Sequence, residues 1–199
     1  MTRSKTDKSG ADKVQEQSQS YEGEDSPFIE ERYEIINNVR FDLKPAPSVT
    51  HQHLVGQLQH LMKTTCRDNG VILVSPLDVF LDDANHFQPD LVFILHENQH
   101  IIKETHIEGV PDLVVEVLSP STSKNDKIAK KDQYERFGVQ EYWIVDPVHS
   151  VLDQFVLENG RYQLSATHAA EGRLTSPLFA CIDIDLEDLF TPVVKSNGK

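Results

Sequence analysis

Residues 109–122, with the sequence GVPDLVVEVLSPST, join an apolar strand, an acidic residue within it and a turn rich in hydroxyl groups. Leu113–Leu118 is apolar except at Glu116, and a second apolar segment, Leu91–Leu95, directly follows Asp90. Such near-continuous apolar runs are typical of strands that are covered on both faces of a sheet. The two segments therefore predict strands of a sheet that is covered on both faces.

Further helices and strands are expected on both sides of this stretch. Apolar positions have helical spacing from Ser48 to about Gly70, and a second helix fits Asp126–Phe137 with Gly138 at its end. The pattern as a whole predicts one domain of the α/β (α+β) class. The other expected elements are strands at 31–36, 39–43, 71–74, 77–81, 142–145, 151–157 and 161–164, hairpin turns at Asn37-Asn38 and Asn159-Gly160, and a closing helix at 186–190.

The composition is that of an acidic globular domain. The chain has 199 residues, of which 38% are hydrophobic, and its 32 acidic and 19 basic residues give a net charge of −13. Phosphate binding needs a basic surface, so this charge disfavours a general nucleic-acid coat but not a local basic site. No apolar run approaches the roughly 18 residues of a membrane span, and no apolar stretch near the N-terminus resembles a secretory signal.

Three parts of the chain differ in composition. Residues 1–27 are polar and charged with hardly any apolar side chain, so we expect a disordered tail that cannot offset the entropy of ordering. Residues 28–194 hold the apolar segments and predict the folded domain. Residues 195–199 form a short polar C-terminal tail.

Two acids interrupt or open the apolar strands. An isolated buried carboxylate is costly, so Asp90 and Glu116 are expected to be paired, protonated or bound to a metal. Asp112 lies four residues before Glu116, which predicts the same face if both lie on one strand. Because Asp112 follows a proline and would cap the strand, a solvated strand edge or a loop hydrogen bond is the favoured interpretation. For Glu116 few structural roles suit a lone mid-strand glutamate.

A basic stripe follows the hydroxyl-rich turn that begins at Ser119. Lys127, Lys130, Lys131 and Tyr134 have the spacing of one helix face. Alone, such a stripe is more often a solvated surface than a site. Its position next to a strand carboxylate favours a site.

These motifs resemble the Uma-two family, a group of bacterial restriction-endonuclease-like proteins in the PD-(D/E)XK nuclease superfamily. The resemblance rests on the stretch quoted above, on GVQEYWIVDP at residues 138–147, on QPDLVF at residues 88–93 and on ERYEII at residues 31–36. It extends through PAPS at residues 45–48 and over the closing segment, and so spans residues 28–190. It implies a restriction-endonuclease-like mixed β-sheet flanked by helices.

The resemblance also implies a divalent-metal site for phosphodiester hydrolysis. Asp90 and Glu116 would match the two metal ligands, and carboxylate oxygens suit Mg²⁺ or Mn²⁺. Glu34 would complete the acidic cluster, and His51 would orient a water or a phosphate unless it is only a surface histidine at a helix start. Supporting positions would be Asp126, Tyr134, Ser119, Thr122 and Asp112.

The position of the lysine departs from the general superfamily pattern. Leu118 stands where the usual motif places its lysine, and Lys130 on the following helix matches the family's position. Asp126 and Tyr134 flank Lys130 at i−4 and i+4. The stripe leaves Lys127 or Lys131 as alternative cations.

The remaining candidates have structural interpretations. Cys66 and Cys181, the two cysteines, are expected to be free buried thiols, which fits a reducing cytoplasm. Trp143 is expected in the core. The other histidines lack the close spacing of a zinc site.

Two functions follow as hypotheses. The first is a metal-dependent endonuclease that hydrolyses DNA, with DNA and a second copy of the chain as partners. The second is a nuclease-like module that binds DNA or protein with little catalysis, which the overall acidity favours.

Overall fold

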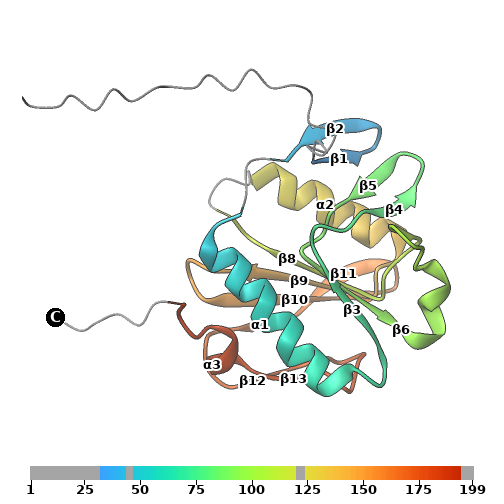
Figure 1. Ribbon diagram of the computed structural model, residues 1–199. Coiled ribbons are helices and arrows are strands. Elements are labelled where there is room, and N and C mark those ends of the chain that lie inside the picture. The colour runs from blue at the N-terminus through green and yellow to red at the C-terminus, as the bar shows by residue number, and fades with distance from the viewer. Residues whose placement is uncertain (1–31, 44–46, 120–123, 194–199) are drawn as a thin grey trace, which may run out of the picture. The chain divides into compact units, whose positions relative to one another are not determined.

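The structure is a computed structural model that describes residues 32–43, 47–119 and 124–193, without the side chains of residues 124–127 (Figure 1). The two expected tails, at 1–27 and 195–199, and Thr122 lie outside the described residues. Among the described helices, none combines the length and the apolar character that a membrane crossing requires.

A six-stranded mixed sheet contains the two apolar strands of the sequence. Its order is β11-β10-β9-β8-β6-β3, and β8 and β9 are its parallel pair. The crossover between these two strands is helix α2. The bounds are β3 Gly70–Val74, β6 Leu91–Leu95, β8 Leu113–Val117, α2 Lys124–Phe137, β9 Glu141–Asp146, β10 Val151–Glu158 and β11 Arg161–His168.

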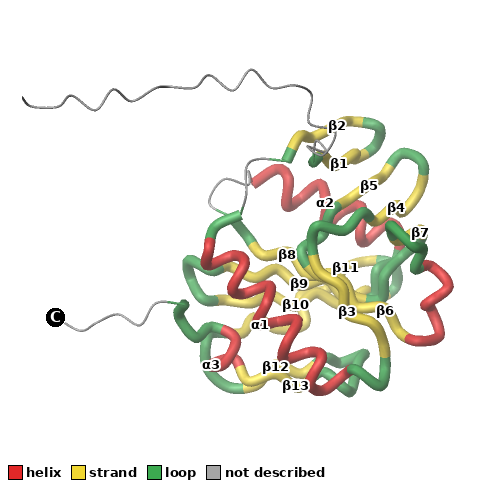
Figure 2. The backbone as a smooth tube through the Cα atoms, in the orientation of Figure 1, coloured by secondary structure: helices red, strands yellow, loops and turns green. Residues whose placement is uncertain are grey.

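Both faces of this sheet are covered, as the apolar runs predict. Leu91 and Val115 belong to a cluster that includes Leu58 of helix α1 (Val49–Cys66), whereas Val92 and Val114 belong to a cluster that includes Tyr134 of α2. Figure 2 shows α1 and α2 on opposite sides of the sheet. The predicted α/β (α+β) architecture, a mixed sheet flanked by helices, is confirmed.

A smaller five-stranded sheet lies beside α2. Its order is β2-β1-β5-β4-β7, and the hairpin of its first two strands turns at Asn37 and Asn38, whose φ angles are 50° and 63°. This confirms the predicted hairpin, because asparagine tolerates positive φ better than most residues. The bounds are β1 Tyr33–Ile36, β2 Val39–Asp42, β4 Val79–Asp82, β5 Asn85–Phe87 and β7 Ile107–Glu108.

The helix boundaries follow local signals in the sequence. Ser48 caps α1, where its Oγ accepts a hydrogen bond from the backbone N–H of His51 at 3.2 Å. Gly138 follows α2 with φ of 87°, a conformation that favours glycine at a helix end. The remaining elements are the 3₁₀ helix η1 His96–Ile101, the hairpin of β12 Arg173–Thr175 and β13 Asp183–Asp185, and α3 Leu186–Leu189.

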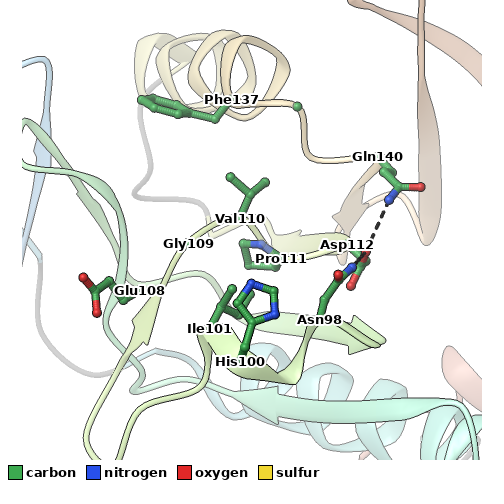
Figure 3. A pocket seen from close by; sticks show the side chains of 11 residues that line it. Asn98, His100, Ile101, Glu108, Gly109, Val110, Pro111, Asp112, Phe137 and Gln140 are labelled. Carbon is green, nitrogen blue, oxygen red and sulfur yellow. Dashed lines mark hydrogen bonds between the residues drawn. The ribbon is translucent and has the colours of Figure 1, made fainter. Parts of the chain in front are cut away.

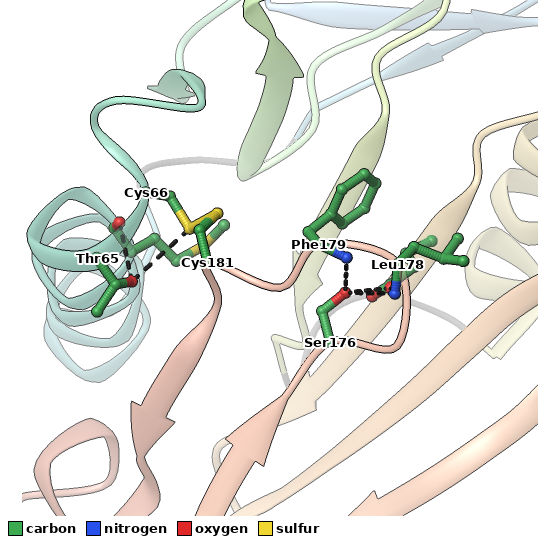
Figure 4. The surroundings of a disulfide bond; sticks show 8 residues. Thr65, Cys66, Ser176, Leu178, Phe179 and Cys181 are labelled. Carbon is green, nitrogen blue, oxygen red and sulfur yellow. Dashed lines mark hydrogen bonds between the residues drawn. A yellow bond between two sulfur atoms is a disulfide. The ribbon is translucent and has the colours of Figure 1, made fainter.

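The prediction of free thiols at Cys66 and Cys181 is wrong. The two residues form a disulfide with a Cα–Cα distance of 5.0 Å, which joins the end of α1 to the segment before β13 (Figure 4). They are 115 residues apart, and only the packing of the C-terminal hairpin against α1 brings them together. Spacing in the sequence carries no signal for such a pair. The cytoplasmic location remains a prediction.

Reducing this disulfide is expected to lower the free energy of unfolding by about 2–4 kcal/mol, because the crosslink closes a long loop in the unfolded chain. Urea denaturation with and without dithiothreitol measures the difference. The double variant Cys66→Ala, Cys181→Ala is the control, since reductant has nothing to reduce in it. An unchanged midpoint for the wild type in reductant would contradict a stabilising crosslink.

Candidate active site

Asp90 lies where β6 begins, and two groups contact its carboxylate. Its Oδ2 accepts a hydrogen bond from the backbone N–H of Val117 at 2.7 Å and contacts Nε2 of His51 at 3.1 Å. His51 comes from the first turns of α1, and Val117 ends β8. The capped start of α1 therefore delivers a histidine to an acid on the neighbouring sheet.

Glu116 of β8 faces α2 and meets two side chains of that helix. Its Oε1 lies 3.2 Å from Nζ of Lys130 and accepts a hydrogen bond from the Tyr134 hydroxyl at 2.9 Å. Lys130 and Tyr134 are one helical turn apart, so both project from the same face of α2. The mid-strand glutamate is thus paired, which offsets the free-energy cost of burying a carboxylate in an apolar strand.

Glu34 of β1 completes the cluster from the smaller sheet. Its Oε1 lies 2.7 Å from Nζ of Lys130 and accepts a hydrogen bond from the backbone N–H of Gln88 at 2.9 Å. The ammonium of Lys130 is therefore held between two carboxylates, from β1 and β8. Only 14% of the Lys130 side chain is exposed.

Burial and neighbouring charges shift the protonation of this cluster. Burial, together with the charges of Asp90 and Glu34, raises the pKa of Glu116 to about 7, although Lys130 acts in the opposite direction. Burial would lower the pKa of Lys130, but the carboxylates of Glu116 and Glu34 outweigh it and raise that pKa above its usual value. Near neutral pH the lysine is a fixed cation beside an acid that exchanges its proton.

His51 is a buried member of the site. Its side chain is 7% exposed, so the surface interpretation is wrong. Burial would lower the pKa of His51, but its hydrogen bond to Asp90 and the charges of Asp90 and Glu116 outweigh burial and raise it. Its Nδ1 is buried and makes no hydrogen bond of standard geometry within the described part of the chain, although the Val117 backbone also contributes to the raised pKa of His51.

Asp112 lies outside this cluster, so the prediction that it supports the site is wrong. Its carboxylate accepts hydrogen bonds from Leu95 N at 2.8 Å, Asn98 Nδ2 at 2.7 Å and Gln140 Nε2 at 3.3 Å. Because β8 begins only at Leu113, strand alternation does not extend to Asp112. It lines a separate pocket of about 450 Å³ between η1 and the end of α2 (Figure 3).

The candidate lysines of the basic stripe occupy different positions in the structure. Lys130 occupies the cluster, whereas Nζ of Lys131 lies 3.4 Å from the centroid of the Phe155 ring. The side chains of Lys127 and Asp126 lie outside the described residues. Ser119, which follows β8, has an interaction partner. Of the predicted residues, the structure brings together Asp90, Glu116, Lys130, Glu34, His51 and Tyr134.

Gln88, two residues before Asp90, is a member of this network that the sequence pattern does not predict. Its backbone N–H holds Glu34, and its side chain bonds Asp78 and Arg32. A glutamine near a strand start has no distinctive pattern, so only the paired strands show what it contacts.

The two acids fit a hard divalent cation in their chemistry. Mg²⁺ typically uses one or two protein carboxylates and retains several waters. Within the described residues, no donor bonds Oδ1 of Asp90 or Oε2 of Glu116. No set of three or more histidine, cysteine, aspartate or glutamate groups that would hold a metal occurs in that part of the chain.

Comparison with known proteins identifies a family and a solved structure that are similar to this chain. A family model described as "Uma2: Putative restriction endonuclease" matches residues 21–187. A crystal structure described as "a putative nuclease belonging to DUF820" from Anabaena variabilis aligns with a TM-score of 0.65 at 17% identity, over 80% of this chain and 89% of that one. No curated protein matches the chain. The structural likeness shows a shared fold and confirms the restriction-endonuclease-like architecture.

Proposed function

This chain belongs to the Uma2 family, whose model matches residues 21–187, and from that premise we propose that it is a metal-dependent endonuclease that hydrolyses DNA phosphodiester bonds. The observation that carries the proposal is the convergence of Asp90, Glu116 and Lys130 from β6, β8 and α2. Two carboxylates beside a buried ammonium are the groups that phosphate hydrolysis uses.

Each residue of the cluster has a role in this proposal. Asp90 and Glu116 would hold Mg²⁺ or Mn²⁺, which when bound lowers the pKa of a water and offsets the charge that grows on the phosphate. Lys130 would orient the attacking water or hold a phosphate oxygen. Glu34 and Tyr134 keep that lysine and Glu116 in place through the contacts described above.

His51 acts on Asp90 in this proposal. Its Nε2 fixes the orientation of the Asp90 carboxylate, and its Nδ1, which has no hydrogen-bond partner among the described residues, is a polar atom for a water or a phosphate oxygen. Buried polar atoms without a partner are rare in native proteins, which supports a ligand at this point.

The alternative function is a nuclease-like module that binds DNA or protein without cleavage. Two observations favour it: the net charge of −13, and the pairing of Lys130 with two carboxylates, which leaves it less charge to offer a phosphate. Steeply salt-dependent binding without cleavage in any divalent metal would support this alternative. A homodimer remains a prediction for either function.

Metal binding should weaken as the pH falls. Because Glu116 has a pKa of about 7, it holds a proton below that pH, and the metal must displace this proton to bind. We expect saturable Mn²⁺ or Mg²⁺ binding at pH 8 and an affinity lower by up to about tenfold per pH unit below 7. Isothermal titration calorimetry at pH 8, 7 and 6 measures this dependence.

The same titration separates the two functions. Saturable binding with the expected pH dependence supports the nuclease and justifies cleavage assays. An absence of binding at pH 8 for both metals would contradict the proposed metal site and leave the binding module as the better account.

A further inference from the structure

A chain of hydrogen bonds leads from the acidic cluster to the loop before β4. The backbone N–H of Gln88 donates to Oε1 of Glu34, the same oxygen that pairs with Lys130. The side chain of Gln88 is fixed at both ends, because its Nε2 donates to Oδ1 of Asp78 at 2.9 Å and its Oε1 accepts from Nε of Arg32 at 3.0 Å. Gln88 therefore connects the lysine's counter-ion to a carboxylate that lies outside the cluster.

Asp78 is itself anchored by a buried histidine. Its Oδ1 also contacts Nε2 of His86 at 2.7 Å, and the His86 side chain is 8% exposed. The imidazole stacks on the Phe80 ring with the centroids 4.5 Å apart and meets the edge of Tyr33 at 5.5 Å. Phe80 and Tyr33 thus pack against the imidazole that contacts Asp78, whose own side chain is 41% exposed.

We propose that Asp78 is a positioning residue for the active site, which acts through Gln88 to keep Glu34 against Lys130. The expected change in kcat rests on the proposed nuclease function, whereas the expected change in the contact between Glu34 and Lys130 does not. Asp78 makes no contact with Asp90, Glu116 or Lys130 among the described interactions, so any effect on the cluster passes through Gln88.

The geometry explains why the loop needs this support. Gln88 follows β5 and precedes Pro89, and a proline disfavours the helical conformation for the residue before it. The backbone of Gln88 is thereby biased toward an extended form, but its N–H points at Glu34 only while the loop stays in place. If Asp78 is removed, Gln88 keeps only the Arg32 contact on its side chain, and Arg32 lies on the exposed surface.

The experiment compares three variants by steady-state cleavage in Mg²⁺. Asp78→Ala removes the acceptor and should lower kcat about three- to tenfold with KM unchanged, the effect of one lost hydrogen bond. Asp78→Asn keeps an oxygen that accepts from both Gln88 and His86, so it should restore kcat. Asp82→Ala is the matched control, because Asp82 accepts from Ala84 N and Asn85 Nδ2, each at 2.8 Å, within the same β4–β5 hairpin.

A second readout is independent of cleavage. In the wild type, the ion pairs should slow proton exchange of the Lys130 ammonium enough for its ¹H–¹⁵N signal to be observed by NMR. Asp78→Ala should broaden this signal, and Asp82→Ala should leave it unchanged. If the wild type cuts no DNA, the proposed function is wrong, but the positioning role of Asp78 is not affected. The NMR signal then still decides whether Asp78 positions Glu34.

Two outcomes would overturn the inference. One is an unchanged Lys130 signal in a folded Asp78→Ala protein. The other is an equal loss in Asp82→Ala, which would mean that any weakening of the hairpin has the same effect.

Discussion

Replacing Glu116 with glutamine should reduce metal-dependent DNA cleavage more than about 100-fold and leave the protein folded. Loss of a group that only supports a metal ligand typically costs 10–100-fold, so loss of a ligand charge should cost at least as much. Glutamine keeps the shape of the side chain and an oxygen that accepts from Tyr134 and Lys130, but it lacks the negative charge. The equivalent change at the other acid, Asp90→Asn, should have a similar effect.

The fold should survive the Glu116 substitution because the ionised carboxylate already lowers the free energy of unfolding. The pKa of Glu116 rises from its usual 4.5 to about 7 on folding, so between these values the native state binds more protons than the unfolded state. Stability from this group is therefore highest below pH 4.5 and falls as the pH rises toward 7. A neutral glutamine removes that loss in the metal-free protein.

Cleavage of a plasmid and of a single-stranded oligonucleotide in Mg²⁺ and in Mn²⁺ measures the effect. Glu108→Gln is the matched control, since the Glu108 side chain is 66% exposed and its ion pair is with Lys103, outside the cluster. Thermal unfolding of all variants shows that they remain folded. Cleavage by Glu116→Gln at the wild-type rate would refute the assignment of this acid.

The sequence predicts those parts of the site in which a residue conflicts with its local pattern. Glu116 stands out because every neighbour in its strand is apolar, and Lys130 because Tyr134 lies one helical turn away. These positions are marked by the 2-residue and 3.6-residue periods of strand and helix. The same periods predict β6, β8 and both long helices within a few residues.

Contacts between distant segments leave no such mark. β5, with the sequence Asn-His-Phe, is too short and polar to be recognised, yet it pairs with β1 and β4 and so determines where Gln88 meets Glu34. The disulfide of Cys66 and Cys181 and the bonds of Asp112 likewise depend on tertiary packing. A resemblance to a family points to candidate acids, but only the structure shows that Glu34 and Glu116 share the ammonium of Lys130.

Glu141 is a further case in which sequence alone gives no warning, because it begins an apolar strand like an ordinary edge residue. In the structure it is fully buried, and its carboxylate accepts hydrogen bonds from Trp143 Nε1 at 2.9 Å, Gln154 Nε2 at 3.3 Å and Leu178 N at 3.1 Å. It also contacts the Ser176 hydroxyl, which in turn accepts from Phe179 N at 2.7 Å (Figure 4). One side chain of β9 thus joins β10 and the segment after β12.

Replacing Glu141 with alanine is expected to lower the free energy of unfolding by at least about 3 kcal/mol. Each buried donor left without an acceptor costs about 1–3 kcal/mol, and the truncation adds a cavity. Urea denaturation measures the loss, and Glu158→Ala, an exposed glutamate on β10, is the matched control with an expected change within about 0.5 kcal/mol. Failure of Glu141→Ala to fold agrees with the prediction, whereas a loss below about 1 kcal/mol would mean that water or rearranged side chains satisfy these donors.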